Sequence, residues 1–304
     1  MKQFRYTLEK YKSQNSKHQC PGCDYKKTLS RYIDIETGEY LNYKVGRCDR
    51  EGKCGYHYTP KMYFQDNNIS NAPTYSFHNI PTQIINEKPS YLNNELIIKH
   101  SLECGNNTLY NFMVKTHGRQ KSTEAFKAYK IGTLNNKSPK TIFWQIDQVY
   151  KIRTGKVFEY DLNTGKRCGT FFLHKYYKID DFNLKQCLFG LHLLKTTEQI
   201  IGIVESEKTA LVASMYFKQL TWLATGSKQM LKEDLLLPLK YNKIILFPDA
   251  GAYDLWNSKA IELKNKFNIT VSNYIETNAN QFLKQEDIDL EDILSGKVFL
   301  AKPS

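Results

Sequence analysis

The stretch from residue 200 to residue 254 constrains the fold more than any other part of the chain. It reads IIGIVESEKTALVASMYF, then TWLATGSKQML and NKIILFPDAGAYDLW. Apolar runs at 200–204 and 244–247 have the length and the β-branched content of buried parallel strands. Between them, apolar side chains recur at helical spacing from 206 to 217, with Ser206 as the capping residue. This alternation of strand and helix predicts a parallel α/β domain.

An acidic side chain follows each of these two predicted strands. Glu205 comes directly after the first, and Asp249 follows the second, with Gly251 allowing a sharp turn into a helix at about 253–267. Because the carboxyl ends of parallel strands form one crevice, the two carboxylates can converge on a divalent cation. Such a Mg²⁺ ion keeps positions for phosphate oxygens, as phosphotransfer requires. The alternative is that Glu205 only favours the helix dipole and Asp249 only forms a turn.

The segments VESEKTAL and FPDAGAYD resemble the Toprim domain of bacterial replicative primases, topoisomerases and some nucleases. That family has a Glu after its first strand and Asp-x-Asp after a later one, and the resemblance extends over about 199–294, including the acidic end DLEDIL. It implies that Glu205 is a ligand of catalytic Mg²⁺ or Mn²⁺, or a general base, and that Asp249 is a metal ligand. The chain departs from the pattern at Gly251, where the family has its second Asp. Asp254, inside the following helix, is the candidate substitute.

Two cationic positions lie near the predicted strand ends. Lys208 is one turn into the first helix, and the turn Gly226-Ser227-Lys228 follows the strand TWLAT. Ammonium and backbone N–H groups at such positions suit a triphosphate or a nucleic-acid backbone, so we expect both to bind phosphate and Lys208 to belong to the catalytic set. A solvated helix lysine is the alternative for Lys208.

Length and charge limit the class of the protein. The chain has 304 residues, enough for one large domain or about two to three small ones. It has no run apolar enough to cross a membrane, and MKQFRYTLEKYKSQ lacks the core of a signal peptide, so we expect a cytoplasmic protein. The net charge of +12 and the many Tyr and Phe residues favour a polyanionic partner, although basic proteins without one are common.

Four cysteines near the N-terminus have the spacing of a metal site. Cys20-Pro-Gly-Cys23 forms one pair, and Cys48 with Cys54 forms a second. Between the pairs, RYIDI and YLNYKVG alternate as strands around a turn at 36–38, which would bring the pairs together. This is the pattern of a zinc ribbon with structural zinc. The five residues between Cys48 and Cys54 leave two alternatives, a histidine ligand, His18 or His57, in place of one thiolate, or no metal.

The same segment resembles the zinc-binding module at the N-terminus of bacterial primases, in which a His commonly stands where this chain has Cys23. The resemblance implies contact with a single-stranded template. Cations around the cysteines would then bind nucleic acid, and the candidates are Arg31, Arg47 and Arg50. A merely solvated basic face is the alternative reading of these residues.

The rest of the chain divides by composition. Residues 66–90, rich in Asn, Ser and Pro, predict a linker after a ribbon module at 1–65. From 91 to 195 we expect two short helices and then a β meander with tight turns at 153–155 and 163–165. Aromatic residues accompany cations in the meander, a mixture suited to single-stranded nucleic acid, although alternation would equally bury the rings. The candidate cations are Lys151, Arg153, Lys156 and Arg167.

Taken together, IDQVYKIRTGKVFEYDLNTGKR, FGLHLL, ESEKTAL, ATGSKQML and FPDAG resemble a primase-like family of Bacteroidota mobile elements and phages. The resemblance implies a primase-core-like region at 91–195 and a Toprim-like domain at 196–304. It implies a replication protein that binds single-stranded DNA and, with Mg²⁺, makes a short primer from nucleotides. Because no Walker A loop is present, a helicase would be a separate partner. A Toprim nuclease and a non-catalytic DNA-binding accessory in replication or defence stay open.

The cysteine pattern predicts one zinc ion per chain at Cys20, Cys23, Cys48 and Cys54. Thiolates must lose their protons to bind zinc, so removal of the metal should unfold the ribbon and leave the C-terminal domain folded. Elemental analysis of protein expressed with ample zinc checks this. Protein without zinc under those conditions would refute the prediction.

Overall fold

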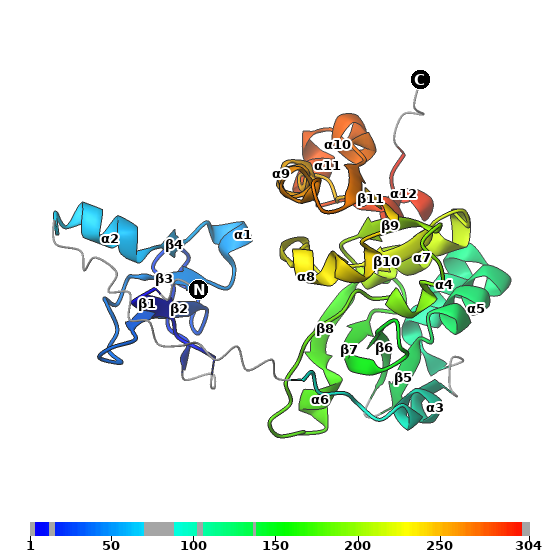
Figure 1. Cartoon of the computed structure of the whole chain (residues 1–304), viewed down its shortest axis with the longest axis horizontal. Helices are drawn as coiled ribbons and strands as arrows, with labels where there is room; N and C mark the ends of the chain where they lie inside the picture. Colours follow the sequence, from blue (N-terminus) through cyan, green and yellow to red (C-terminus); the bar gives the residue numbers. More distant parts are fainter. Residues whose placement is uncertain (1–3, 12–15, 70–87, 102–105, 136–137, 300–304) are drawn as a thin grey trace. The chain divides into compact units, whose positions relative to one another are not determined.

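The structure is a computed structural model that describes residues 4–11, 16–69, 88–101, 106–135 and 138–299. The chain forms two compact units, residues 1–86 and 87–304, and each is described by itself (Figure 1). The predicted linker at 66–90 falls largely on residues 70–87, which lie outside the described residues.

The first unit is built on a four-stranded antiparallel sheet in which each strand pairs with the next along the chain. The chain reverses after the second strand, where Gly38 N–H donates to Asp34 O at 2.8 Å, so the predicted turn at 36–38 is confirmed. The elements are β1 (Tyr6–Leu8), β2 (Leu29–Asp34), β3 (Gly46–Cys48), α1 (Glu51–Cys54), β4 (His57–Tyr58) and α2 (Pro60–Asp66).

Helix α1 accounts for the wide spacing of the second cysteine pair. Cys48 ends β3 and Cys54 ends α1, so the intervening residues form a helical turn that brings the chain back beside the strand. Gly55, with a φ of 70°, closes this turn in the left-handed region. Two cysteines separated by five residues therefore lie on one side of the sheet.

The second unit begins with helices that lead into a four-stranded antiparallel sheet, β5 to β8 in chain order. Asn107 caps α4 by accepting a hydrogen bond from Tyr110 N–H at 3.0 Å. The elements are α3 (Glu95–Ser101), α4 (Thr108–His117), α5 (Arg119–Ala128), β5 (Gly132–Asn135), β6 (Pro139–Ile146), β7 (Ile152–Tyr160), β8 (Arg167–Phe172), α6 (Leu173–Tyr176) and η3 (Leu191–Leu193).

One predicted turn of the meander is wrong and the other is confirmed. The turn between β6 and β7 is at 147–150, where Tyr150 N–H donates to Asp147 O at 3.0 Å, and 153–155 lies inside β7. This strand position is a glycine because a Cβ there would lie 2.8 Å from the Ile142 side chain of the neighbouring strand β6. The turn at 163–165 connects β7 and β8 as expected, with Gly165 N–H donating to Asp161 O.

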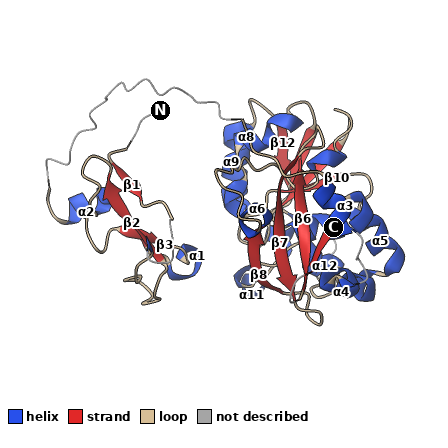
Figure 2. Ribbon diagram, turned by 90° about the horizontal axis from the view of Figure 1, so that it is seen from below, coloured by secondary structure: helices blue, strands red, loops and turns tan. Residues whose placement is uncertain are grey.

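The second sheet of this unit is parallel, in the order β10-β9-β11-β12, and confirms the predicted parallel α/β architecture (Figures 1 and 2). The predicted strands at 200–204 and 244–247 are β9 and β11. The predicted helices at 206–217 and 253–267 are α7 and α9, and α9 ends earlier than expected. The strands are β9 (Ile200–Val204), β10 (Thr221–Ala224), β11 (Lys243–Leu246) and β12 (Asn268–Val271).

Helices connect these strands and cover both faces of the parallel sheet. Alternate residues of the strands point to opposite faces, so Ile203 packs with Trp256 of α9 while Trp222 packs with α7. The helices are α7 (Glu207–Tyr216), η4 (Lys228–Met230), α8 (Glu233–Leu236), η5 (Leu237–Leu239), α9 (Tyr253–Leu263), α10 (Tyr274–Asn278), α11 (Gln281–Gln285) and α12 (Leu290–Leu294).

The two sheets of the second unit share one hydrophobic core. Phe143 and Phe158 of the antiparallel sheet belong to the same buried cluster as Trp222 of the parallel sheet. Tyr129, at the end of α5, is buried and donates its hydroxyl hydrogen to Trp222 O at 2.8 Å. The middle and C-terminal regions therefore pack against each other, and the domain boundary at residue 196 stays a prediction.

No helix among the described residues combines the length and the apolar character needed to span a membrane.

Candidate functional site

Glu205 lies where β9 meets α7. Strand β9 is buried up to Val204, and Ser206 caps α7 by accepting a hydrogen bond from Thr209 N–H. On the opposite side, Gly226 N–H donates to Glu205 O at 2.8 Å, which fixes the backbone of the acid against the loop after β10. Only 6% of Glu205 is exposed. The carboxylate is thus held at the carboxyl end of the strand, as the sequence predicts.

Asp249 reaches the same edge of the sheet from β11. Phe247 N–H still pairs with Ile203 O of β9 at 2.8 Å, so the two strands stay side by side up to the acids. A backbone hydrogen bond from Asp249 reaches the Glu205 carboxylate and lowers its pKa. The strand order changes direction between β9 and β11, and that switch point is where parallel sheets bind ligands.

Two further acids, which the sequence analysis did not assign, join this pair. Ala250 N–H donates to Ile288 O at 2.8 Å, so residues 287–289 lie against the Asp249 loop. Asp287 and Asp289 flank the buried Ile288, and the charge of each raises the pKa of both Glu205 and Asp249. The sequence pattern that could have identified these two acids is Asp-Ile-Asp before α12, in which one apolar residue lies between two acids.

These four residues, Glu205, Asp249, Asp287 and Asp289, are called the acid cluster below. Burial raises the pKa of Glu205 to about 7, and the charge of Lys228 counteracts this only in part. Burial and the Glu205 charge together raise the pKa of Asp249 well above its ordinary range. Burial also raises the pKa of Asp289 to about 6, assisted by Asp292 and Glu291. The protein therefore holds Glu205, Asp249 and Asp289 in a site that disfavours their negative charge.

The acid cluster fits a divalent cation. Oε1 of Glu205 is buried and has no hydrogen-bond partner among the residues that the structure describes. A buried, unpaired carboxylate oxygen is costly, and an ion bound there would satisfy it. Carboxylate oxygens are the donors that Mg²⁺ and Mn²⁺ take. Glu205 and Asp249 would hold such an ion from two strands.

Gly251 and Asp254 are exposed residues of the loop and helix that follow Asp249. Gly251 is exposed with a φ of 77°, a conformation that few residues other than glycine adopt, and its N–H donates to Glu276 Oε2 at 2.8 Å. Asp254 is exposed in the first turn of α9, where a carboxylate favours the helix dipole. The role of Asp254 as a substitute ligand stays a prediction.

Lys208 turns toward another acid. Its Nζ lies 2.9 Å from Glu291 Oε2, and Lys297 Nζ lies 3.0 Å from Glu291 Oε1. Carboxylates of Asp289, Glu291 and Asp292 also lie close together. Lys208 and Lys297 neutralise Glu291, and Asp289 and Asp292 form the capping box at the start of α12. The structure thus gives Lys208 a structural ion pair, and its predicted catalytic and phosphate-binding roles stay predictions.

The turn Gly226-Ser227-Lys228 lies beside the acid cluster. Gly226, with a φ of 84°, accepts a hydrogen bond from Lys156 Nζ at 2.8 Å, and the same ammonium binds Glu207 Oε1 at 2.9 Å. Ser227 O accepts from the Thr225 hydroxyl. The turn is therefore fixed from the antiparallel sheet, and Lys156, predicted to bind nucleic acid, is mainly occupied inside the protein.

The four predicted zinc ligands come together in the first unit. Their sulfur atoms all lie within 4.8 Å of one another. Backbone N–H groups point at three of the sulfurs, for example Gly22 N–H to Cys20 Sγ at 3.4 Å and Arg50 N–H to Cys48 Sγ at 3.3 Å. Burial raises the pKa of Cys20 to about 12, so this thiol becomes a thiolate near neutral pH only with a cation beside it. The set has the chemistry and geometry of a tetrahedral Cys₄ zinc site.

Both histidines considered as alternative ligands have other partners. His18 Nε2 lies 3.3 Å from the Tyr40 hydroxyl. His57 contacts Glu51 through Nδ1 and the Tyr32 hydroxyl through Nε2, at 3.1 and 3.0 Å. The four cysteines alone form the close set, and this favours Cys₄ over a histidine ligand.

Cations of the ribbon pair with aromatic rings. Arg50 lies 3.6 Å from the ring centre of the exposed Tyr25, and Arg31 lies 5.6 Å from that of Tyr40. Arg47 is exposed and binds Glu51. Arg50 and Arg31 each bring a flat guanidinium to an aromatic face, which is also the surface on which a base can stack.

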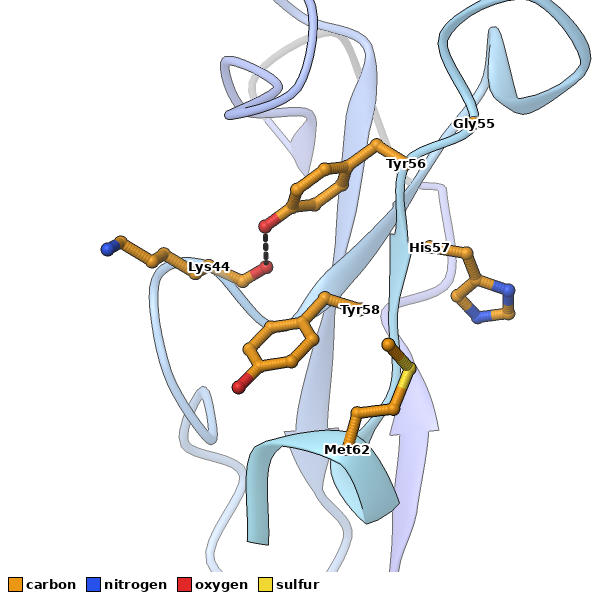
Figure 3. A pocket seen from close by; sticks show the side chains of 6 residues that line it. All are labelled: Lys44, Gly55, Tyr56, His57, Tyr58 and Met62. Carbon is orange, nitrogen blue, oxygen red and sulfur yellow. Dashed lines mark hydrogen bonds between the residues drawn. The ribbon is translucent and has the colours of Figure 1, made fainter. Parts of the chain in front are cut away.

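A shallow cavity of about 390 Å³ lies on the same ribbon (Figure 3). Tyr56 and Tyr58 place their rings on one side of β4 and His57 points to the other, while Met62 of α2 closes the lower edge. The Tyr56 hydroxyl donates to Lys44 O at 2.8 Å, so this ring is fixed in place. The cavity offers two aromatic rings beside a lysine.

The remaining predicted nucleic-acid residues lie on the antiparallel sheet. Lys151 is exposed beside Tyr91, with its Nζ 4.9 Å from the ring centre. Arg153 packs on the same ring and binds the buried Asp147 at 2.9 Å, so its charge is partly neutralised. Arg167 is exposed on β8 beside Phe158. Lys151 and Arg167 are thus the two that face solvent.

Two family models match the chain. Residues 4–69 match a zinc beta-ribbon finger family, and residues 107–250 match a domain of unknown function, DUF6371. No curated protein matches the chain in sequence.

Solved structures similar to the chain include primases. The primase fragment of the bacteriophage T7 primase-helicase protein is 13% identical, with a TM-score of 0.39, over 84% of this chain and 89% of that one. The Escherichia coli primase catalytic core is 12% identical, with a TM-score of 0.39, over 66% and 81%. The RNA polymerase domain of Mycobacterium tuberculosis primase is 9% identical, with a TM-score of 0.41, over 58% and 72%.

The raised pKa of Glu205 predicts a pH-dependent stability. An acid whose pKa is higher in the folded than in the unfolded state binds more protons when folded, so stability falls as pH rises from about 4.5 through about 7. The loss attributable to Glu205 is on the order of 3 kcal/mol at most. Glu205→Gln should remove this part of the slope and stabilise the chain at pH 8 without divalent ions.

Chemical denaturation followed by tryptophan fluorescence measures this effect in the second unit, because Trp144, Trp222 and Trp256 all lie there. Glu286→Gln, at an exposed acid of the neighbouring loop, is the charge control and should keep the wild-type slope. Equal slopes for wild type and Glu205→Gln would mean that Glu205 is not held in an unfavourable site.

Proposed function

We propose that the chain is a primase-like nucleotidyltransferase of a mobile element or phage, which binds single-stranded DNA and synthesises a short primer with Mg²⁺ or Mn²⁺ at a Toprim-like site. The observation that carries the proposal is the acid cluster at the switch point of the parallel sheet, with its unpaired, buried Glu205 oxygen. The motifs VESEKTAL and FPDAGAYD, which resemble Toprim domains, supply the two acids at its centre.

The chemistry of primer synthesis suits this arrangement. A 3′-hydroxyl oxygen bonds to the α-phosphorus of a nucleoside triphosphate, the bond to the bridging oxygen breaks, pyrophosphate leaves, and the hydroxyl proton passes to a base. A bound divalent cation would neutralise the phosphate charge. Glu205 and Asp249 would hold it, or Asp249 would hold it with Glu205 accepting the proton as general base. The N–H groups and the ammonium of the 226–228 turn would orient the triphosphate.

Template binding is assigned to the aromatic and cationic surfaces. On the ribbon, the cavity lined by Tyr56 and Tyr58 has the size and the rings to accept an unpaired base, with Lys44 beside it for a phosphate. On the antiparallel sheet, Lys151 and Arg167 are free to face a nucleic-acid backbone while Tyr91 offers a ring. The zinc ion would keep the ribbon folded.

One observation favours a second candidate. The exposed Gly251 removes a carboxylate that the Toprim pattern supplies, so the chain could have kept the fold and the DNA-binding surface and lost catalysis. Asp287 and Asp289 argue against that outcome because their segment lies against the Asp249 loop and brings other acids beside it.

A synthesis assay with two labels tests the proposal. Single-stranded DNA labelled at its 5′ end is incubated with differently labelled ribonucleotides and Mg²⁺ or Mn²⁺. We expect short products that carry the nucleotide label, and a loss of about 100-fold or more in Glu205→Gln, because the charge that holds the cation is gone. Glu286→Gln is the matched control and should remain active.

The other outcomes identify the other candidates. Shortening of the labelled template without nucleotide incorporation would indicate a Toprim nuclease. Template binding with neither outcome would indicate the non-catalytic accessory. Equal product from wild type and Glu205→Gln would remove the acid cluster from the mechanism.

A further inference from the structure

The tip of the hairpin between β6 and β7 presents a tyrosine to solvent. Val149 and Tyr150 are 64% and 52% exposed, although the strands on both sides of the tip are largely buried. Tyr150 has a φ of 59°, a conformation that glycine and asparagine adopt easily and tyrosine adopts at a cost. The chain therefore places a large aromatic ring at a turn position where a smaller residue would be less strained.

Hydrogen bonds from inside and outside the hairpin fix this tip. The carboxylate of the buried Asp147 accepts from Val149 N–H at 3.1 Å and from Lys151 N–H at 3.0 Å. From outside the hairpin, Asn94 Nδ2 donates to Tyr150 O at 3.2 Å. A surface turn that is held in this way loses little conformational entropy when it binds a partner.

Cations and a second ring lie next to Tyr150. Lys151 Nζ lies 4.9 Å from the ring centre of Tyr91, and the Arg153 guanidinium lies 5.0 Å from the same centre. The Tyr150 ring lies edge-on to the buried His192, with 6.3 Å between ring centres, and this contact restricts its rotation. The tip thus combines two aromatic rings with two cations in a fixed arrangement.

We propose that Tyr150 is the ring on which an unpaired base of single-stranded DNA stacks, with the Lys151 ammonium on the adjoining phosphate. An aromatic ring accepts any base by stacking, and a neighbouring cation binds the backbone that links the bases. Charge selects this partner over a protein surface, because Asp147 is the one acid in the sequence 147–153 and it is buried. This inference rests on the proposed function, because it places on Tyr150 part of the single-strand binding proposed for this sheet.

Binding of single-stranded DNA to the zinc-loaded full chain tests the inference without measuring catalysis. Fluorescence anisotropy of a labelled oligothymidylate gives Kd at several salt concentrations. Tyr150→Asn should weaken binding about tenfold, the equivalent of one lost base stack, and should leave the salt dependence unchanged. Lys151→Met should reduce the slope of log affinity against log salt by about 0.7, because one phosphate contact is lost.

The strained backbone at Tyr150 gives a second readout with the opposite sign. Asparagine adopts a positive φ more readily than tyrosine, so Tyr150→Asn should keep Tm or raise it, by about 2 °C at most. Thermal unfolding followed by tryptophan fluorescence measures this change. A ring that served only the fold would instead lower Tm when it is removed.

Two variants are matched controls, and a crosslink locates the contact. Tyr150→Phe keeps the ring and should bind as wild type. Tyr241→Asn removes another exposed tyrosine that also has a lysine beside it, Lys240, and should leave Kd unchanged. Iododeoxyuridine in the DNA crosslinks on irradiation to a ring stacked on it, and mass spectrometry of the digested complex should place the crosslink at Tyr150.

Each result bears on a separate claim. Wild-type Kd in Tyr150→Asn, or weaker binding together with a lower Tm, overturns the role of Tyr150 and leaves the proposed function standing. A wild-type chain that binds no single-stranded DNA overturns both. Dimers in sedimentation that Tyr150→Asn abolishes would assign the tip to a second copy of the chain and overturn the inference. Tenfold weaker binding by Tyr150→Asn, in a protein whose wild type makes no primer, supports the role of Tyr150 and counts against primer synthesis alone.

Discussion

Burial of the Glu205 carboxylate is the constraint on which the rest of the site depends. The side chain is almost fully buried at the end of a central strand, and one oxygen has no protein partner within the described part of the chain. Such a group is expensive unless it is protonated or bound to a cation. The backbone around such a group must be rigid. Here, contacts from several elements of the second unit fix it.

The antiparallel sheet of the second unit supplies much of this support. Lys156 reaches from β7 to the Gly226 carbonyl and to Glu207, which lies two residues after Glu205. Because Gly226 N–H also binds Glu205 O, one lysine fixes both sides of the loop that carries the acid. Phe143, opposite Lys156 in the sheet, belongs to the core shared with α7. The region before the parallel sheet thus determines the geometry of the acids.

The sequence predicts the elements whose signals are local. Strand β9, helix α7 with its Ser206 cap, and the positions of Glu205 and Asp249 follow from apolar periodicity and one capping residue. The four cysteines follow from their spacing. The β6–β7 turn was missed because Tyr150 takes a φ of 59°, which the turn rules reserve mostly for Gly, Asn and Asp. Gly155 gave a false turn signal, since its role is to leave room for Ile142.

Contacts between residues far apart in the chain could not be predicted from the sequence. Asp287 and Asp289 join the site through the Ala250–Ile288 hydrogen bond, and the pairing of Lys208 with Glu291 depends on how α12 packs against α7.

The most direct test of the account is an anomalous diffraction map from crystals grown with Mn²⁺. It should show one peak at about 2.1 Å from carboxylate oxygens of Glu205 and Asp249. Full Mn²⁺ occupancy elsewhere, with no peak at Glu205, would contradict the account.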